Sequence, residues 1–561
     1  MPALGIEQDY QTAVRHHRAG RLHEAQALYR QVLSCQADHA DALHLLAVVT
    51  SQLGKPEDAA DLIRRAIALN PAAGHYFSNL GMVLAMTGQL DEAITAFERA
   101  LALGPHVPEA HNNLANVLRD TGRLQKAIVG YRRTLALRPD YVEAMYNLAA
   151  ALQLNDQLDE AADLLKTAIA LRPSYPEAFN SLGDVLRERG RPEEAIAAFR
   201  KAVALRPQFV EACNNLGLAL QEAGLFDEAV EVLRRACALS PELAEPRFAL
   251  ATALLARGDF EQGWPLYEAR WRMKSRAPEP AFVQPRWDGS SLAGRRILLH
   301  GEQGLGDIIQ FIRYVPLVRD RGGVCIVLCP PELRRLLEGQ CGIEQVVDDG
   351  ETRPPFDVHC PLLSLPGLLG TTLQTIPAQV PYLRPDEALA TLWQDRLSHE
   401  PPALKVGLNW AGSPLPRHNR HRSMPLATLA PLADVTGVRF YSLQKGNASH
   451  EANSPPAGMQ LVNWSDDLHD FADTAALISA LDLAITIDTS VAHLAGALGQ
   501  PAWVMLVRAP DWRWMLSRDD SPWYPKMRLF RQSQDRDWNN VVDQIARELR
   551  ALTKQGGMAR R

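Results

Sequence analysis

Prolines recur along the first half of the chain at a constant spacing of 34 residues. They are Pro71, Pro105, Pro139, Pro173, Pro207 and Pro241. Two further residue types keep the same step, namely Ala25, Ala59, Ala93, Ala127, Ala161, Ala195 and Ala229, and Gly20, Gly54, Gly88, Gly122, Gly190, Gly224 and Gly258. A period of roughly 20 to 50 residues is typical of a solenoid, in which each unit buries one face against the next.

Within each unit, the alanine suits a point where two helices cross and the glycine suits the end of the first helix. Asp156 replaces the glycine once, and Asn155 with Asp156 can supply the turn because short polar side chains tolerate left-handed geometry. The pattern resembles the tetratricopeptide repeat. It predicts a solenoid over residues 1–271, with seven full repeats and a degenerate eighth that begins near Glu245 and caps the array.

A polar residue also keeps the repeat period. Asn79, Asn113, Asn147 and Asn215 occupy one position of the first helix, with Ser181 interrupting the series. In one interpretation each amide bonds the neighbouring helix. In the other, the series resembles the asparagine ladder of the protein O-GlcNAc transferases, which grips the backbone of an extended polypeptide, since an amide both donates and accepts hydrogen bonds.

Residues 272–294 lose the helical period and gather proline, glycine and serine, which predicts a linker that Trp271 and Trp287 anchor. From Arg295 onward apolar runs of strand length alternate with helical patterns. We expect strands at RRILLHG, VCIVLCP, LKVGLNWAG, RFYSLQKG, LDLAITID and PAWVML, and helices at DIIQFIRYVPLVRDRG, MPLATLAPLADV, FADTAALISAL, VAHLAGALG and WNNVVDQIARELRALT.

This alternation predicts an α/β domain of two Rossmann-like halves, residues 295–385 and 400–553, facing a cleft. We expect the tail 554–561 to be disordered.

Two motifs carry a family resemblance: GEQGLGD at 301–307 and IDTSVAHLAGALGQP at 487–501. Together they resemble the heptosyltransferases of glycosyltransferase family 9, over roughly residues 295–550. The resemblance implies a GT-B fold and the inverting transfer of a sugar from a nucleotide diphosphate sugar. It implies no required metal, and the nucleotide sugar is a co-substrate, so no cofactor is expected.

In the first motif, Gly301, Gly304 and Gly306 let the backbone approach a ligand, and Asp307 falls in the first turn of a helix. Such an aspartate caps helices well. At the lip of a cleft it could also accept the proton of an acceptor hydroxyl, and the resemblance assigns the matching residue this role as base.

In the second motif, Asp488, Thr489 and Ser490 end a strand, so that the free amides of the next helix face the sheet edge, where a diphosphate would lie. His493 could hydrogen-bond a phosphate or sugar oxygen. The alternative is a capping set with a buried histidine bonded to the backbone.

Three arginines of the loop 409–426, Arg417, Arg420 and Arg422, stand close to Gly412 and could neutralise phosphate. Arg422 aligns with a family lysine that contacts the donor. In the alternative interpretation, the arginines belong to a basic loop that is merely solvated. We include Gly304, Gly306, Gly412 and Lys445 in the predicted donor-binding set.

Trp512, Trp514, Trp523 and Tyr524 cluster in a segment expected to be mostly loop. Exposed aromatic rings could stack on a base or sugar, or they could seal the domain to the solenoid. Asp535 and Asp537 form a DxD, a metal-binding cue in other glycosyltransferases, but helix capping is the preferred interpretation because a helix follows at once.

Composition excludes some classes of function. With 59 basic and 65 acidic side chains the net charge is -6, which does not favour nucleic acid or anionic lipid. We expect no membrane span and a cytoplasmic location, because no apolar run approaches the roughly 18 residues that a bilayer requires. The 7 cysteines lack metal-binding spacing, so we expect structural thiols in a reducing compartment.

The sequence therefore predicts a glycosyltransferase whose solenoid holds a polypeptide acceptor. Two alternatives stay open. One is a protein-interaction scaffold with a non-catalytic nucleotide-sugar domain. In the other, the acceptor is a lipid-linked glycan and the solenoid recruits a partner protein.

Overall fold

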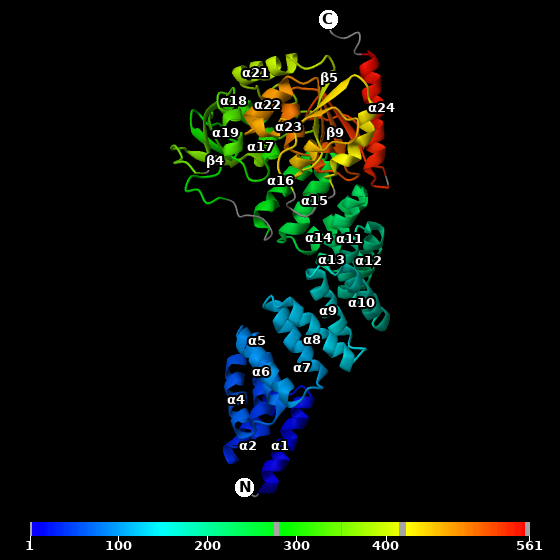
Figure 1. The fold of residues 1–561 in the computed structure, drawn as a ribbon. Helices are drawn as coiled ribbons and strands as arrows, with labels where there is room; N and C mark the ends of the chain where they lie inside the picture. Colours follow the sequence, from blue (N-terminus) through cyan, green and yellow to red (C-terminus); the bar gives the residue numbers. More distant parts are fainter. Residues whose placement is uncertain (1–2, 274–279, 349, 414–421, 534, 556–561) are drawn as a thin grey trace. The chain divides into compact units, whose positions relative to one another are not determined.

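A computed structural model describes residues 3–273, 280–348, 350–413, 422–533 and 535–555 (Figure 1). Arg417, Arg420 and the end of the expected tail, residues 556–561, lie outside the described residues. The chain divides into two compact units, one ending at Asn215 and the other beginning at Leu216, within helix α13. Most of the last two repeats, from Leu216 onward, therefore belongs to the same unit as the α/β region.

Helices α1 to α16 precede the first strand and form successive antiparallel pairs, as predicted for the repeats. They are α1 (Ala3–Arg18), α2 (Leu22–Cys35), α3 (Ala40–Gln52), α4 (Pro56–Leu69), α5 (Gly74–Met86), α6 (Leu90–Leu103), α7 (Pro108–Asp120), α8 (Leu124–Leu137), α9 (Val142–Leu154), α10 (Leu158–Leu171), α11 (Pro176–Glu188), α12 (Pro192–Leu205), α13 (Val210–Glu222), α14 (Phe226–Leu239), α15 (Ala244–Arg257) and α16 (Phe260–Tyr267). The eighth pair is degenerate as expected, because α16 is short and continues as a 3₁₀ helix, Glu268–Arg272.

The repeat signature has the predicted geometry. The period alanines from Ala25 to Ala229 are fully buried. The period glycines adopt the left-handed conformation, and Asp156 takes their place with a φ of 61°. At Gly183 an added Cβ would lie 2.5 Å from the Phe199 ring, so adjacent helices approach closely there.

The first sheet of the α/β region has the order β3-β2-β1-β4, and its strands are parallel. Its elements are β1 (Arg296–His300), α17 (Leu305–Phe311), α18 (Val315–Asp320), β2 (Val324–Cys329), α19 (Pro331–Leu337), β3 (Ile343–Asp348), β4 (Val358–Pro361) and α20 (Leu365–Leu368). The prediction of one helix across DIIQFIRYVPLVRDRG was wrong, since a 3₁₀ turn, Ile312–Tyr314, separates α17 from α18. Pro316 explains the break because proline lacks the N–H that a continuous helix needs.

The second sheet is also parallel, in the order β10-β9-β8-β5-β6-β7. Its elements are α21 (Glu387–Ser398), β5 (Leu404–Asn409), β6 (Val438–Ser442), β7 (Leu461–Val462), α22 (Phe471–Ser479), β8 (Leu483–Ile487), α23 (Ser490–Ala497), β9 (Ala502–Leu506), β10 (Met527–Arg531) and α24 (Trp538–Gln555). The segment MPLATLAPLADV was predicted to be an α-helix but forms a 3₁₀ helix, Leu426–Asp434, which contains Pro431.

Burial shows why these strands could be recognised from apolar runs. Strands β8 and β9 are buried along their whole length, as parallel strands covered on both faces are. One core joins this sheet to α24 and includes Trp410, Leu429, Ile485 and Val542. In the described part of the chain, no helix is both long enough and apolar enough to cross a bilayer.

The aromatic segment after β9 is not exposed. Trp512, Trp514, Trp523 and Tyr524 are all buried, which disfavours the interpretation in which exposed rings stack on a ligand. Trp512 lies 5.2 Å from Trp264 of α16 between ring centroids, which supports the other interpretation, a seal against the last repeat.

Capping accounts for the DxD at the start of α24. Asp537 accepts a hydrogen bond from the Asn539 amide at 3.0 Å, as an N-cap residue does.

The residue with a left-handed backbone conformation in each repeat turn, glycine or Asp156, allows a matched test of the turn. We expect Gly190→Asp to lower the free energy of unfolding by about 1 kcal/mol, because an L side chain is strained at a φ of 72°. The reverse change one repeat earlier, Asp156→Gly, should not lower it. Urea unfolding of both variants checks the pair, and equal destabilisation by both would contradict this account of the turn.

Candidate active site

The two motifs meet where α17 packs against α23 (Figure 1). A Cβ placed on Gly306 would lie 2.8 Å from Cδ2 of His493 and 3.3 Å from Cα of Ser490. Only glycine permits this approach without a shift of the neighbouring backbone. Segments 301–307 and 488–493 therefore share one surface.

Asp307 stands in the first turn of α17 and has two kinds of partner. Its Oδ2 accepts a hydrogen bond from the Gly304 amide at 3.0 Å, so it caps the helix from the third helical position, while Gly304 and not Asp307 is the N-cap. Its Oδ1 forms an ion pair with Arg513, a nearly buried residue of the other sheet's half.

Arg513 was missed in the sequence, where it stands between two tryptophans and belongs to no motif. Its guanidinium also binds Asp511 at 2.7 Å and Gln310 at 2.8 Å. Arg513 thus links Asp307 to the segment that follows β9.

Asp488 follows β8 and lies largely buried. Burial raises its pKa to about 6, and Asp511 adds to this effect while Arg422 opposes it. Its Oδ2 lies 3.9 Å from Nη1 of Arg422. The Nε of Arg422 is buried and has no hydrogen-bond partner among the described residues, so the guanidinium keeps a donor for another acceptor.

Gly412 belongs to the same surface. A Cβ at this position would lie 3.4 Å from Nε of Arg422 and 3.4 Å from Cγ2 of Thr489. A larger side chain here would crowd both residues, which is consistent with the predicted grouping of these three positions.

A buried amide network fixes the ends of β5, β6 and β8. Asn409 accepts hydrogen bonds from the hydroxyls of Thr489 at 2.8 Å and Thr486 at 3.0 Å. Gln444 accepts from the side chain of Asn409 at 2.9 Å and from the Ala411 amide at 2.9 Å. Because the Thr489 hydroxyl is turned toward Asn409, the first-turn amides of α23 receive no side-chain cap from it.

His493 is buried in the first turn of α23 and is neutral. Its Nδ1 shares a hydrogen bond of 2.9 Å with the Tyr524 hydroxyl, and its ring stacks on Trp514 at 5.3 Å. Burial lowers its pKa well below the usual range, and Arg513, Arg313 and Arg422 lower it further. The alternative expected from the sequence was a buried His493 bonded to the backbone. In the structure the bond goes to the Tyr524 hydroxyl instead.

Lys445 stands at the exposed end of β6. Its Nζ donates to the Ser465 carbonyl at 2.7 Å. The structure thus ties Lys445 to the segment after β7, and no ion pair joins it to Asp488 among the described residues.

Glu302, the second residue of the first motif, was also missed. Its side chain is buried, and it lies 2.9 Å from Arg270 of the 3₁₀ helix that ends the last repeat. Burial raises the pKa of Glu302 to about 7, against the opposing effect of Arg270.

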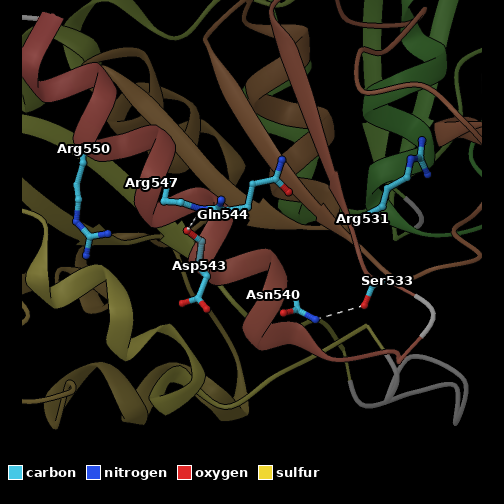
Figure 2. A pocket seen from close by; sticks show the side chains of 7 residues that line it. All are labelled: Arg531, Ser533, Asn540, Asp543, Gln544, Arg547 and Arg550. Carbon is cyan, nitrogen blue, oxygen red and sulfur yellow. Dashed lines mark hydrogen bonds between the residues drawn. The ribbon is translucent and has the colours of Figure 1, made fainter.

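Two surface cavities lie elsewhere. One, of about 550 Å³, runs along α24 (Figure 2) and is lined by Arg531, Ser533, Asn540, Asp543, Gln544, Arg547 and Arg550. The second, of about 400 Å³, is lined by Ala256, Arg257, Met515, Leu516, Ser517, Arg518 and Asp520. Neither lining includes a residue of the two motifs.

The asparagine series contacts the preceding repeat. The amide nitrogens of Asn147 and Asn215 lie 3.4 Å and 3.2 Å from the side-chain oxygens of Asn112 and Asn180. Asn79 lies 2.6 Å from His44. These bonds support the first interpretation, a bond to the neighbouring helix, and each amide remains half-buried with further donor and acceptor capacity.

Family comparison decides the nature of the repeats. The tetratricopeptide repeat family matches residues 10–74, 51–108, 78–131, 150–208, 180–244 and 214–272, and a second tetratricopeptide repeat family matches residues 106–174. The N-terminal half is a tetratricopeptide repeat array.

Similar proteins match part of the chain. Protein FlbA of Caulobacter vibrioides is 29% identical over 313 residues, which are 51% of this chain and 52% of FlbA. The chain thus spans about half the length of this relative.

Among solved structures, MamA is 31% identical, with a TM-score of 0.28, and covers 30% of this chain and 97% of its own. YrrB, described as a tetratricopeptide repeat protein with an unusual peptide-binding site, is 22% identical, with a TM-score of 0.30, and covers 33% of this chain and 95% of its own.

Because the pKa of Asp488 is raised, we expect a neutral residue at this position to increase the free energy of unfolding by an amount that depends on pH. The folded chain binds this proton more tightly than an exposed aspartate does, so the favourable contribution is complete below about pH 4 and is lost as the pH rises through about 6. We expect Asp488→Asn to raise the free energy of unfolding by about 2 to 3 kcal/mol at pH 7 and by almost nothing near pH 4.

Urea unfolding between pH 4 and 7.5 measures this difference. The exposed Asp434→Asn serves as the control for loss of one negative charge. A gain that does not change with pH would contradict the burial of the Asp488 charge.

Proposed function

We propose that the chain is a glycosyltransferase that moves a sugar from a nucleotide diphosphate sugar to a polypeptide acceptor on the repeats. The observation that carries the proposal is the contact between Gly306 and the Ser490–His493 turn. It puts the carboxylate of Asp307 and the N-terminus of α23 on one surface. An acid–base group and an anion-binding helix end are what transfer from a diphosphate requires.

The two parallel sheets support a GT-B arrangement, in which the donor lies at the carboxyl ends of the second sheet. Strands β5, β6 and β8 end at the network of Asn409 and Gln444, and α23 begins there. Ligands of parallel sheets bind at such strand ends. The diphosphate would therefore accept hydrogen bonds from the first-turn amides of α23 and from Arg422.

Positive charge at this place favours the departure of the diphosphate. Burial lowers the pKa of His493, and the nearby charges of Arg513, Arg313 and Arg422 lower it further. Preorganised cations stabilise charge that develops on a leaving group, so no metal is needed in the proposed mechanism. A neutral His493 can offer the N–H of Nε2 to a phosphate or sugar oxygen.

Asp307 would act as the base that accepts the proton of the acceptor hydroxyl. The Arg513 guanidinium orients this carboxylate through a charge-assisted hydrogen bond. The acceptor hydroxyl would donate to this carboxylate as it attacks the sugar. Because the acceptor hydroxyl would attack the sugar directly as the diphosphate leaves, the configuration at the reacting carbon of the sugar would be inverted.

Asp307→Asn tests this role. We expect the variant to lose transfer by a factor of at least about 100 while it keeps donor binding, because the amide cannot take up the proton. Asp511→Asn is the matched control, since it also removes a carboxylate from Arg513 but leaves the base. Transfer from a panel of nucleotide sugars, read by mass spectrometry of candidate acceptors, measures the rates.

An equal loss of transfer in both variants would indicate that Asp307 serves only the ion pair with Arg513. Calorimetric titration of the unmodified chain with nucleotide diphosphates separates the enzyme from the scaffold. Absence of binding at millimolar ligand would favour a protein-interaction scaffold, the function that the repeat array supports by itself.

The repeat array provides the proposed acceptor site. In the double variant Asn147→Ala/Asn215→Ala we expect binding of an extended acceptor peptide to weaken about tenfold, since each amide offers hydrogen bonds to a peptide backbone. The exposed Gln125→Ala is the control for a lost surface amide. Fluorescence anisotropy with a labelled acceptor peptide measures affinity, and unchanged affinity would leave the ladder with its structural bonds alone.

A further inference from the structure

The last repeat touches the candidate site at two places. The first is a buried fork, which is a pair of hydrogen bonds from one guanidinium to one carboxylate. From the 3₁₀ helix after α16, Arg270 donates to Glu302 through Nε at 3.0 Å and through Nη2 at 3.2 Å. Both side chains are almost fully buried. The bond reaches from residue 270 into the GEQGLGD motif, five residues before Asp307.

Arg270 has further fixed partners. Its Nη1 donates to Glu268 at 2.7 Å, and its Nη2 donates to Ser364 at 2.8 Å. Arg286 binds the same Glu268 and donates to Ser364 at 2.6 Å. A guanidinium with this many partners can hold only one orientation, so it fixes the carboxylate of Glu302 as well.

The next motif residue is held from the same element. Gln303 donates to the Tyr267 hydroxyl at 3.4 Å, and Tyr267 is the last residue of α16. Two successive residues of the glycine-rich loop therefore contact the end of the repeat array.

The second place is the aromatic cluster beside Arg513. The Trp512 ring lies 5.2 Å from Trp264 and 6.0 Å from Tyr267 between centroids. Trp264 is itself fixed, because its indole donates to the Thr371 carbonyl at 3.1 Å. Trp512 immediately precedes Arg513, so both partners of the Asp307–Arg513 ion pair are supported from α16 and its extension.

We propose that the terminal repeat is a built-in brace of the candidate site, and that Arg270 is a positioning residue that fixes the 301–307 loop through Glu302. The compact unit of the α/β region begins at Leu216 and so includes this repeat. Binding energy gained by a partner on α13–α16 could reach the loop through this contact.

Hydrogen exchange by the intact chain tests the brace without any assumption about sugar transfer. We expect Arg270→Met to speed amide exchange in residues 300–311 about tenfold or more, because it leaves the buried Glu302 unpaired. Peptides from repeats that end before Asn215 should exchange as in the unmodified chain. Arg272→Met is the matched control, since this arginine of the same 3₁₀ helix is exposed and lies 4.0 Å from Glu242, and exchange in 300–311 should not change.

A conservative variant covers the case in which Arg270→Met does not fold. Arg270→Lys keeps the charge but cannot reproduce the fork, so it should fold and still show faster exchange in 300–311. Unchanged exchange in a folded Arg270 variant, or an equal effect of Arg272→Met, would overturn the brace.

Nucleotide diphosphate binding by the same variants distinguishes positioning from bulk stability. If the site is the proposed donor site, uridine or guanosine diphosphate should bind the Arg270 variants about tenfold more weakly than the unmodified chain and Arg272→Met. Affinity equal in all variants would remove the positioning role. If the unmodified chain binds neither nucleotide, the proposed function fails, and the exchange rates still decide on the brace.

Discussion

The close contact at Gly306 is the constraint on which the α/β region depends. Without a side chain at this position, α17 reaches the Ser490–His493 turn of α23, although the two helices follow strands of different sheets. Other bonds between the two halves surround this contact. Arg313 donates to the Trp523 carbonyl at 2.7 Å, and Arg513 pairs with Asp307. A larger residue at 306 would separate the groups that the proposed chemistry needs together.

Much of the fold could be predicted from the sequence, because the signals that specify it are local. The 34-residue period fixed the repeats, and fully buried strands such as β8 appear as continuous apolar runs. Strand β3 was missed since its polar residues are exposed at the edge of the sheet. The helix errors at residues 312–314 and 426–434 both come from prolines whose effect outweighed an apolar helical pattern.

The candidate site was predictable only in part. Glycines and an aspartate near a strand end have a recognisable spacing, so Gly306, Asp307 and Asp488 could be named. Arg513 and Arg270 could not, because their partners lie far away in the sequence and an arginine has no local signature for a buried role. The aromatic segment shows the same limit: composition revealed the cluster of tryptophans but not that Trp512 and Trp514 are buried.

The charge of Asp488 bears on how a diphosphate could enter the proposed site. A carboxylate beside an incoming anion is repelled, and it can relieve the repulsion by taking up a proton. With a pKa of about 6, protonation of Asp488 at pH 7 costs about 1.4 kcal/mol, whereas an aspartate with the ordinary value would require about 4 kcal/mol. Burial of Asp488 destabilises the folded chain above pH 6, where the carboxylate is charged. The same burial lowers the free-energy cost of binding the diphosphate. Once Asp488 is protonated, its weak contact with Arg422 would be lost, and Arg422 would pair with the phosphate instead.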